Sequence, residues 1–340
     1  MIAAFRRLGP RNLWNGLATI VLVLALWQAG AALFDWAVIR GHGWDTGPKQ
    51  CQLDGGACWA VLTEKYRFIL FGRYPYEQQW RPAVVIGIFV ALFGASASRY
   101  SWRPALAGLW VAALALVLVL MRGGFAPLPL VPQDQWGGLP ITLLLSSVGC
   151  VLAFPLAVLV ALGRRARTLP AIRLLCVIYI EVIRGVPLVA LLFMASVMLP
   201  LFLPAGMNFD KLVRVQVVII LFAAAYLAEA VRGGLQALPQ GQFEAAEALG
   251  LSYWQTQRRI ILPQALRLVI PSLVNIFTGL FKDTSLVLIV GILDFLTAGK
   301  VALADPAWQG FGNEVYLALG AVYLGFSLFL SASSRRLEAT

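Results

Sequence analysis

Eight long apolar segments constrain this chain of 340 residues more than any other feature of its sequence. Each approaches or exceeds the length that a helix needs to cross a lipid bilayer. Hydrophobic residues make up 60% of the chain and charged residues 13%, which is more apolar surface than one soluble core can bury. The sequence therefore predicts an all-α polytopic membrane protein with about eight transmembrane helices. These segments lie at about residues 17–39, 82–98, 104–121, 136–164, 172–199, 213–230, 266–296 and 315–330.

Arginines flank these segments on alternate sides, which predicts how the chain is threaded through the membrane. Basic loops tend to stay in the cytoplasm, and the order found here places the polar stretch 40–80 outside and both termini in the cytoplasm. The scattered basic residues, with a net charge of +11, form no concentrated face for nucleic acid. The residues concerned are Arg6, Arg7, Arg11, Arg99, Arg103, Arg164, Arg165, Arg167, Arg335 and Arg336.

A stretch rich in glycine and proline at residues 122–132 interrupts the apolar pattern. A helix could not cross it intact, because proline lacks a backbone donor and clashes with the preceding turn. We place a domain boundary here. Residues 1–130 would form an N-terminal extension with three transmembrane helices and a periplasmic loop at 40–80. Residues 131–340 would form a second domain with five transmembrane helices.

The cysteines and the single histidine limit the chemistry open to the chain. Cys51 and Cys58 share the loop 40–80 and are spaced too far apart for a Cys-x-x-Cys motif. They can form a disulfide if that loop faces an oxidising compartment. His42 has no nearby set of ligands, so no metal site is expected.

The sequence lacks the common motifs for catalysis and for nucleotide binding. It has no carboxylate pair with a histidine, no Gly-x-Ser-x-Gly and no His-Glu-x-x-His. It also lacks a Gly-x-x-x-x-Gly-Lys-Ser/Thr loop that would hold phosphates. We therefore expect a protein that is not an enzyme and has no cofactor of its own. If it uses ATP, the nucleotide must bind to another chain.

A polar, alanine-rich stretch at residues 244–263 separates the sixth and seventh apolar segments. Ala245, Ala246 and Leu249 favour a helix, and Gly250 favours its termination in a left-handed conformation. A helix faced with alanines has little relief, so a partner protein could approach its backbone closely. An ordinary loop between two spans is the other interpretation, and the pattern by itself leaves both open.

A second helix is expected directly after this turn. Ser252 and Gln255 have the spacing of a capping box, in which each side chain bonds the other's backbone N–H. The stretch therefore predicts two short helices joined by a tight turn outside the bilayer.

Two adjacent ionisable residues, Lys282 and Asp283, lie inside the seventh apolar segment. A charge in hydrocarbon costs about 2.5–3.5 kcal/mol even on a lenient scale. Neighbours on a helix point about 100° apart, so each would pair with another helix or line an aqueous cavity. One interpretation is an ion pair that locks two helices. The other is that these residues, with Thr284 and Ser285, border the path of a polar or zwitterionic solute.

Two Glu-x-x-Arg pairs recur in the fifth and sixth segments. Glu181 with Arg184, and Glu229 with Arg232, each lie on one helical face at i,i+3. A glycine and a proline shortly after Arg184 would break the fifth helix just beyond the first pair. We interpret both pairs as interfacial ion pairs that fix a gate region, and solute binding is the alternative.

The stretch 244–263 reads Glu-Ala-Ala, three residues, Gly, nine residues, Ile-x-Leu-Pro. This resembles the cytoplasmic signature loop of the membrane subunits of bacterial ABC importers. Segments 180–188, 225–236 and 281–286 resemble the polar amino acid permease family, and the resemblance covers about residues 136–338. It implies a type I ABC importer permease core of five helices. Ala157 stands where that family would have a glycine.

The three-helix N-terminal extension departs from the minimal pattern of this family. With segments 56–59 and 71–75, it is similar to the M-type permease of general L-amino acid or glutamate/glutamine/aspartate importers. The resemblance implies a subunit of the bacterial inner membrane that moves polar L-amino acids into the cytoplasm by alternating access.

The resemblance also implies partners and site residues. This chain would pair with a second homologous permease subunit, bind two copies of an ABC ATPase that hydrolyses the ATP, and receive an amino acid from a periplasmic binding protein. Coupling to the ATPase would fall on the loop 239–263, at Glu244, Ala245, Ala246, Leu249, Gly250 and Pro263. The candidate solute path or gate comprises Lys282, Asp283, Thr284, Ser285, Glu229, Glu181 and Arg184.

Two other functions compete with this one. An ATP-independent channel or ion-coupled carrier for a small polar solute needs no docking helix, so the alanine-rich stretch argues against it. A membrane-bound enzyme subunit is disfavoured by the missing catalytic motifs.

Overall fold

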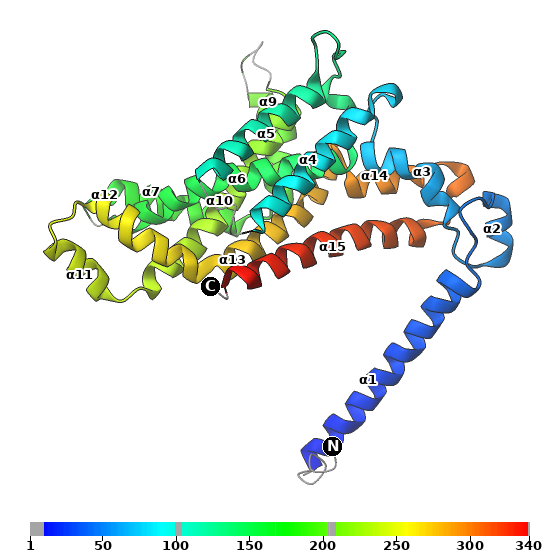
Figure 1. The fold of residues 1–340 in the computed structure, drawn as a ribbon, viewed down its shortest axis with the longest axis horizontal. Helices are drawn as coiled ribbons and strands as arrows, with labels where there is room; N and C mark the ends of the chain where they lie inside the picture. The colour runs from blue at the N-terminus through cyan, green and yellow to red at the C-terminus, as the bar shows by residue number, and fades with distance from the viewer. Residues whose placement is uncertain (1–9, 99–103, 167, 203, 205–208, 339–340) are drawn as a thin grey trace. The chain divides into compact units, whose positions relative to one another are not determined.

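The computed structural model describes residues 10–98, 104–166, 168–202, 204 and 209–338, mainly as helices (Figure 1). The chain divides into two compact units, Met1–Tyr66 with Ala302–Ala318 and Arg67–Val301 with Leu319–Thr340. The division predicted at residue 130, between an extension and a family core, stays a prediction. Of the predicted topology signals, Arg6, Arg7, Arg99, Arg103 and Arg167 lie outside the described residues.

The first unit combines the N-terminal helices with a later segment of the chain. Its long helix α1 is mainly apolar and ends in a π-helical turn before the polar loop begins. Helices α3 and α15 begin in this unit and continue into the second. The elements are α1 (Pro10–Phe34), the π-helical turn (Asp35–Ile39), α2 (Pro48–Asp54), α3 (Ala60–Phe71), a 3₁₀ turn (Pro306–Trp308) and α15 (Gly312–Glu338).

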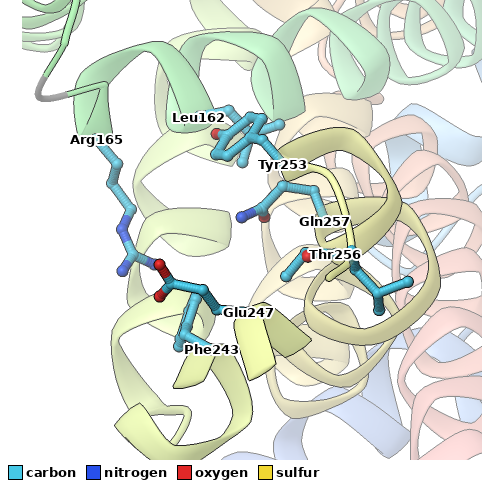
Figure 2. Close-up of a pocket in the computed structure, with 8 residues that line it drawn as sticks. Leu162, Arg165, Phe243, Glu247, Tyr253, Thr256 and Gln257 are labelled. Carbon is cyan, nitrogen blue, oxygen red and sulfur yellow. The ribbon is translucent and has the colours of Figure 1, made fainter. Parts of the chain in front are cut away.

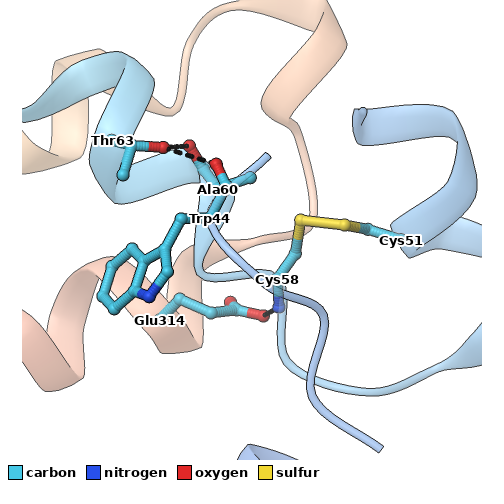
Figure 3. Close-up of a disulfide and its surroundings, with 6 residues drawn as sticks. All are labelled: Trp44, Cys51, Cys58, Ala60, Thr63 and Glu314. Carbon is cyan, nitrogen blue, oxygen red and sulfur yellow. Dashed lines mark hydrogen bonds between the residues drawn. A yellow bond between two sulfur atoms is a disulfide. The ribbon is translucent and has the colours of Figure 1, made fainter. Parts of the chain in front are cut away.

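A disulfide between Cys51 and Cys58 closes the polar loop of this unit (Figure 3). The Cys58 backbone N–H donates to Glu314 Oε1 at 2.9 Å, and both groups are buried. The Thr63 hydroxyl lies 2.9 Å from the Trp44 carbonyl oxygen. These bonds satisfy polar groups of an irregular loop that would otherwise be costly to bury.

The second unit is built around three long helices, α6, α10 and α13, which pack against one another. A Cβ atom at Gly234 of α10 would lie 2.5 Å from the Ala265 carbonyl oxygen of α13. One at Gly149 of α6 would lie 2.8 Å from Ile219 and 3.2 Å from Leu280. The helices therefore approach closely where glycines leave room. Because Gly234 lies beside Ala265 while Ile219 and Leu280 both lie beside Gly149, α10 and α13 run antiparallel.

The bounds of the remaining elements of this unit follow the chain. They are α4 (Trp80–Ser96), α5 (Pro104–Arg122), α6 (Gly138–Arg165), α7 (Pro170–Gly185), α8 (Leu188–Phe193), α9 (Leu199–Phe202), α10 (Lys211–Ala237), α11 (Gln240–Ala248), α12 (Tyr253–Thr256), α13 (Leu262–Asp283), β1 (Leu293–Asp294) and α14 (Phe295–Ala302). The two-residue strand β1 bridges to Gly137 and Gly138 at the start of α6.

In its described residues the structure has seven helices long and apolar enough to cross a membrane, or eight if one bent pair counts as a span. This confirms the prediction of an all-α polytopic membrane protein with about eight spans. The seventh span runs from Tyr253 to Val290 as one helical stretch. The predicted segment 266–296 begins within this stretch but ends too late, because β1 at Leu293 lies within it.

The fifth span predicted at residues 172–199 is a bent pair of helices rather than one straight helix, and the pair is either one broken span or a re-entrant loop. Helix α7 ends at Gly185, and the helical stretch that follows from Leu188 is bent by 102° from it. Proline at position 187 has no N–H for a continuing helix, as expected from the sequence. Helix α7 crosses the end of α6, because a Cβ atom at Gly163 would lie 2.6 Å from the Cys176 sulfur.

Candidate functional site

Helix α11 presents most of its surface outward, and Phe243 and Ala246 are its least exposed residues. Ala246 is 1% exposed and Phe243 is half-buried, whereas Leu249 is 76% exposed. Glu244 and Ala245 are exposed on the surface of the protein. Of the residues predicted to couple to an ATPase, Ala246 therefore packs inward, while Glu244, Ala245, Leu249 and Gly250 are exposed at α11 and its end. Pro263 lies apart from them, exposed in the first turn of α13.

The end of α11 has the hydrogen bonds of a Schellman motif. The Leu251 N–H donates to the Ala246 carbonyl at 3.2 Å, and the Gly250 N–H to the Glu247 carbonyl at 2.9 Å. Gly250 has φ +69°, in the left-handed region where a side chain costs energy. Two of the last carbonyls are thereby satisfied, so this short helix ends at a defined residue.

Helix α12 follows at once and leads into the next span. The Gln255 N–H donates to the Ser252 hydroxyl and the Ser252 N–H to the Gln255 amide oxygen, which confirms the predicted capping box. A π-helical turn, Gln257–Ile261, then joins α12 to α13. It ends two residues before Pro263, which cannot donate to a carbonyl four residues earlier. Such turns relieve a broken hydrogen-bond pattern inside a continuous helix.

A cavity of about 420 Å³ lies between α11, α12 and the end of α6. Figure 2 shows the Arg165 guanidinium and the Glu247 carboxylate pointing toward one another at one side of it. The residues that line it are Leu162, Arg165, Phe243, Glu247, Leu251, Tyr253, Thr256 and Gln257. No pattern in the sequence indicates this cavity, because its walls come from segments about eighty residues apart.

Five charged residues meet where α6, α7 and α10 come together. Glu229 lies at the centre, with its carboxylate bonded to Arg164, at 2.7 Å from Arg232 and at 3.8 Å from Arg184. Glu181 joins the group through Arg164 at 3.1 Å. Three guanidinium groups surround two carboxylates, so this ion cluster carries one net positive charge.

The pairing inside this ion cluster is only partly the one that the sequence suggests. Glu229 does pair with Arg232 three residues later. Glu181 pairs with Arg164 and Arg184 pairs with Glu229, and in the described chain no salt bridge joins Glu181 to Arg184. The sequence indicates Arg164 only as a topology signal. Its two carboxylate partners lie 17 and 65 residues away, which a pattern along one helix cannot reveal.

Lys282 and Asp283 lie at the end of α13, apart from the ion cluster. The Lys282 side chain is exposed and Asp283 is half-buried, and neither has a salt-bridge partner in the part of the chain that is described. The hydroxyl of Thr284 donates to the Phe281 carbonyl at 2.7 Å and that of Ser285 to the Lys282 carbonyl at 2.8 Å. Both hydroxyls therefore donate to carbonyls in the last turn of α13, so toward any other group they can only accept a hydrogen bond.

The antiparallel register separates the two groups of charges. Gly234 lies opposite Ala265, so Glu229 lies opposite about residue 270 and Lys282 opposite about residue 217. Twelve residues of helix between these levels correspond to about 18 Å. The candidate residues that the sequence placed in one path or gate therefore form two sites at different depths.

Comparison with known proteins identifies the family. Residues 153–340 match the family described as binding-protein-dependent transport system inner membrane component. The inner membrane amino-acid ABC transporter permease protein YhdY of Escherichia coli (strain K12) is 44% identical over 329 residues, 95% of this chain and 88% of the relative. The glutamate/glutamine/aspartate/asparagine transport system permease protein BztC of Rhodobacter capsulatus is 38% identical, over 97% of this chain and 90% of the relative.

A solved structure agrees with these relatives. The crystal structure of an amino acid ABC transporter with histidines matches with a TM-score of 0.52 at 30% identity, over 59% of this chain and 91% of that one. These proteins are transporters and transport permeases rather than enzymes, and they give no support to an ATP-independent carrier. The chain belongs to the family of binding-protein-dependent transport system inner membrane components.

Proposed function

We propose that this chain is the permease subunit through which an ATP-driven importer moves polar L-amino acids into the cytoplasm. Both relatives that cover nearly the whole chain carry amino acids or an amino-acid transport system in their names. The observation that carries the proposal is α11, a capped helix whose outer face is free and which stands between two candidate spans. A carrier that works without an ATPase has no use for such a helix.

In the proposed complex this chain works with three kinds of partner. A second homologous permease subunit completes the solute path, two copies of an ABC ATPase bind the cytoplasmic loops, and a periplasmic binding protein delivers the amino acid. ATP binds to the ATPase, since this sequence has no phosphate-binding loop. Both termini and α11 face the cytoplasm, and the loop closed by the Cys51–Cys58 disulfide faces the periplasm, where disulfides persist.

Coupling would run from the ATPase through α11 into α13. Glu244, Ala245 and Leu249 form the contact face, and Gly250 fixes the angle of the following turn. The helical stretch from Tyr253 to Val290 is continuous, so a movement of its first turn is transmitted along its length. Lys282 lies near the Val290 end of that stretch, far from α11, and we place the solute path there.

The ion cluster around Glu229 is proposed as the inner gate. It fastens α6, α7 and α10 together by charges on three helices. Charge pairs of this kind can exchange partners as helices move, whereas a packed apolar contact has one favoured arrangement. Glu181 and Arg184 would thus hold the gate, and Lys282, Asp283, Thr284 and Ser285 would border the solute about 18 Å away.

The coupling role is tested with two variants of one residue. No atom lies within 4 Å of a Cβ added at Gly250, so only the left-handed backbone opposes a side chain there. Asparagine tolerates that conformation and valine does not. In the complete complex in proteoliposomes, Gly250→Val should lose ATPase stimulation by the binding protein while Gly250→Asn retains most of it. Equal stimulation in wild type and Gly250→Val would reject the coupling role.

The solute path is tested by uptake of labelled amino acids into the same proteoliposomes. Lys282→Ala and Asp283→Ala should reduce transport while ATPase stimulation persists. Arg173→Ala, at an exposed position of α7 outside these sites, serves as the control. Normal uptake by both variants in an assembled complex would remove Lys282 and Asp283 from the path.

A further inference from the structure

The cavity behind α11 has the size and lining of a small-molecule site. Its volume is about 420 Å³, inside the range of roughly 300–1,000 Å³ that is typical of ligand pockets. Leu162, Phe243 and Leu251 supply apolar walls, and a few polar groups converge from α6, α11 and the π-helical turn. Nothing in the coupling or gating roles above requires this space.

One side of the cavity carries a cation and an anion close to each other. Arg165 and Glu247 point toward one another there (Figure 2), and no salt bridge joins them in the described chain. Arg165 uses one N–H on the Leu235 carbonyl at 2.9 Å and lies over the Phe243 ring at 5.3 Å. A guanidinium group has five N–H donors, and among the described residues no other hydrogen bond of Arg165 is found.

A buried polar group in the cavity wall lacks a partner. Gln257 is 6% exposed, and its amide oxygen has no hydrogen-bond donor in the structure. Figure 2 shows that the amide nitrogen of Gln257 points toward the side on which Arg165 and Glu247 lie. The buried oxygen does not face the cavity, whereas the amide nitrogen is a donor, so a ligand carboxylate on this side would have a second donor beside Arg165.

We propose that this cavity binds a free α-amino acid. In such a molecule one carbon carries both a carboxylate and an ammonium group, which matches a cation and an anion side by side. Arg165 and the Gln257 amide N–H hold the carboxylate, and Glu247 accepts from the ammonium group. The ligand's side chain lies against Leu162 and Leu251. The choice of ligand class rests on the proposed function, because it is the class of solute that would accumulate on this side.

Such a ligand would restrain α11. It would connect α11 and the π-helical turn to the end of α6, which belongs to the packed body of the second unit. The coupling helix could then move relative to α6 only by breaking these contacts or by releasing the ligand. A cytoplasmic amino acid would therefore slow the transporter as its concentration rises.

The test measures equilibrium binding to the intact complex of both permease subunits and the ATPase in nanodiscs, without binding protein or nucleotide. The probes are labelled L-glutamine, L-glutamate and L-arginine, which share one head group. Unlabelled 4-aminobutanamide is glutamine without the carboxylate, and unlabelled glutaramic acid is glutamine without the ammonium group. Both should compete poorly. Glu247→Gln and Gln257→Leu should each weaken binding about tenfold or more, and Arg173→Ala should not.

The outcomes separate this site from its competitors. Binding that survives Glu247→Gln and Gln257→Leu would lie elsewhere, in the solute path, and would overturn the proposal. No binding of any probe would also overturn it, as expected if an ATPase side chain fills the cavity. ATP-driven uptake with the binding protein is measured separately, so a complex that transports amino acids but lacks this site rejects only the site.

Discussion

At the scale of single residues, Glu229 lies at the centre of the ion cluster. Its carboxylate is 15% exposed and bonds arginines from three helices, Arg164, Arg184 and Arg232. Removing a partly buried carboxylate leaves three guanidinium groups with only Glu181 to balance them. The cost comes mainly from the guanidinium charges that are left unpaired, and less from the favourable energy of the broken salt bridges.

Glu229→Gln should therefore destabilise the protein by about 2 kcal/mol or more. Glu181→Gln is the matched control, because the Glu181 side chain is 61% exposed and has a single partner. An exposed ion pair contributes about 0–1 kcal/mol to stability, so the melting temperature of Glu181→Gln should stay near that of wild type. Thermal unfolding of both variants in the same detergent compares them, and equal melting temperatures would contradict the central place of Glu229.

A second residue-scale prediction concerns the salt bridge between Lys65 and Asp305 in the first unit. The Lys65 Nζ lies 2.7 Å from Asp305 Oδ2. The hydrogen bond from Lys65, the larger influence, and that from the Ala307 N–H hold the Asp305 pKa below its usual value. Burial lowers the Lys65 pKa, but hydrogen bonds with Asp305 and Glu64 outweigh it and leave the pKa raised.

The pair should therefore stabilise this unit at intermediate pH. A lowered carboxyl pKa gives stability that is present above the unfolded value of about 3.9 and is lost as the pH falls through the folded pKa. A raised ammonium pKa gives stability that is present below about 10.4 and is lost as the pH rises through the folded pKa. Hydrogen exchange of this unit should show both losses in wild type and neither in a Lys65→Met, Asp305→Asn variant. Identical pH profiles would contradict the pairing.

At the scale of elements, the close approach of α10 and α13 depends on which of two neighbouring residues faces inward. A Cβ atom at Gly234 would meet a backbone oxygen and the Val269 side chain, whereas one at Gly233 has nothing within 4 Å. Backbone cannot move aside without shifting a whole helix. The sequence shows two equivalent glycines, and the helix packing makes only one of them a close contact.

Gly234→Ala and Gly233→Ala should have effects of opposite sign. Alanine at position 234 forces the helices apart and should destabilise by about 1–3 kcal/mol, as overpacking does. Alanine at position 233 gains helix propensity and should stabilise by up to about 1 kcal/mol. Melting temperatures of the two variants test this directly, and a stabilised Gly234→Ala would show that α10 and α13 are farther apart.

At the scale of the whole molecule, the number of membrane crossings decides which loops share a side. Between the disulfide loop and α11 lie α4, α5, α6, the bent pair from α7 to α9, and α10. If the bent pair crosses the membrane once, the loop and α11 lie on opposite sides. If it enters and returns on the same side, they lie together.

Labelling of single cysteines should therefore place Leu53→Cys and Leu249→Cys on opposite sides. Both positions are strongly exposed, at 83% and 76%. With the native cysteines replaced, a membrane-impermeant maleimide should modify position 53 in intact spheroplasts and position 249 only in inverted vesicles. Modification of both positions in spheroplasts would show that the bent pair is re-entrant.

Local features could be predicted well from the sequence. The turn at Gly250, the capping box of Ser252 and the helix break before Pro187 all depend on residues within a few positions of each other. Backbone conformation at such places is set by neighbours in the chain, so short patterns suffice. The salt bridges of Glu181 and Arg184 could not be predicted in the same way, because their partners lie on other helices.

By itself the sequence determined the apolar segments, their approximate number and the end points of the short helices, because bilayer length and backbone geometry act locally. Only the tertiary structure decided that α7 crosses the end of α6, that Arg164 bonds two glutamates, and that a cavity lies behind α11. In each case the deciding quantity is how helices far apart in the chain pack. That depends on side-chain shape and charge summed over several helices, which no single stretch of sequence contains.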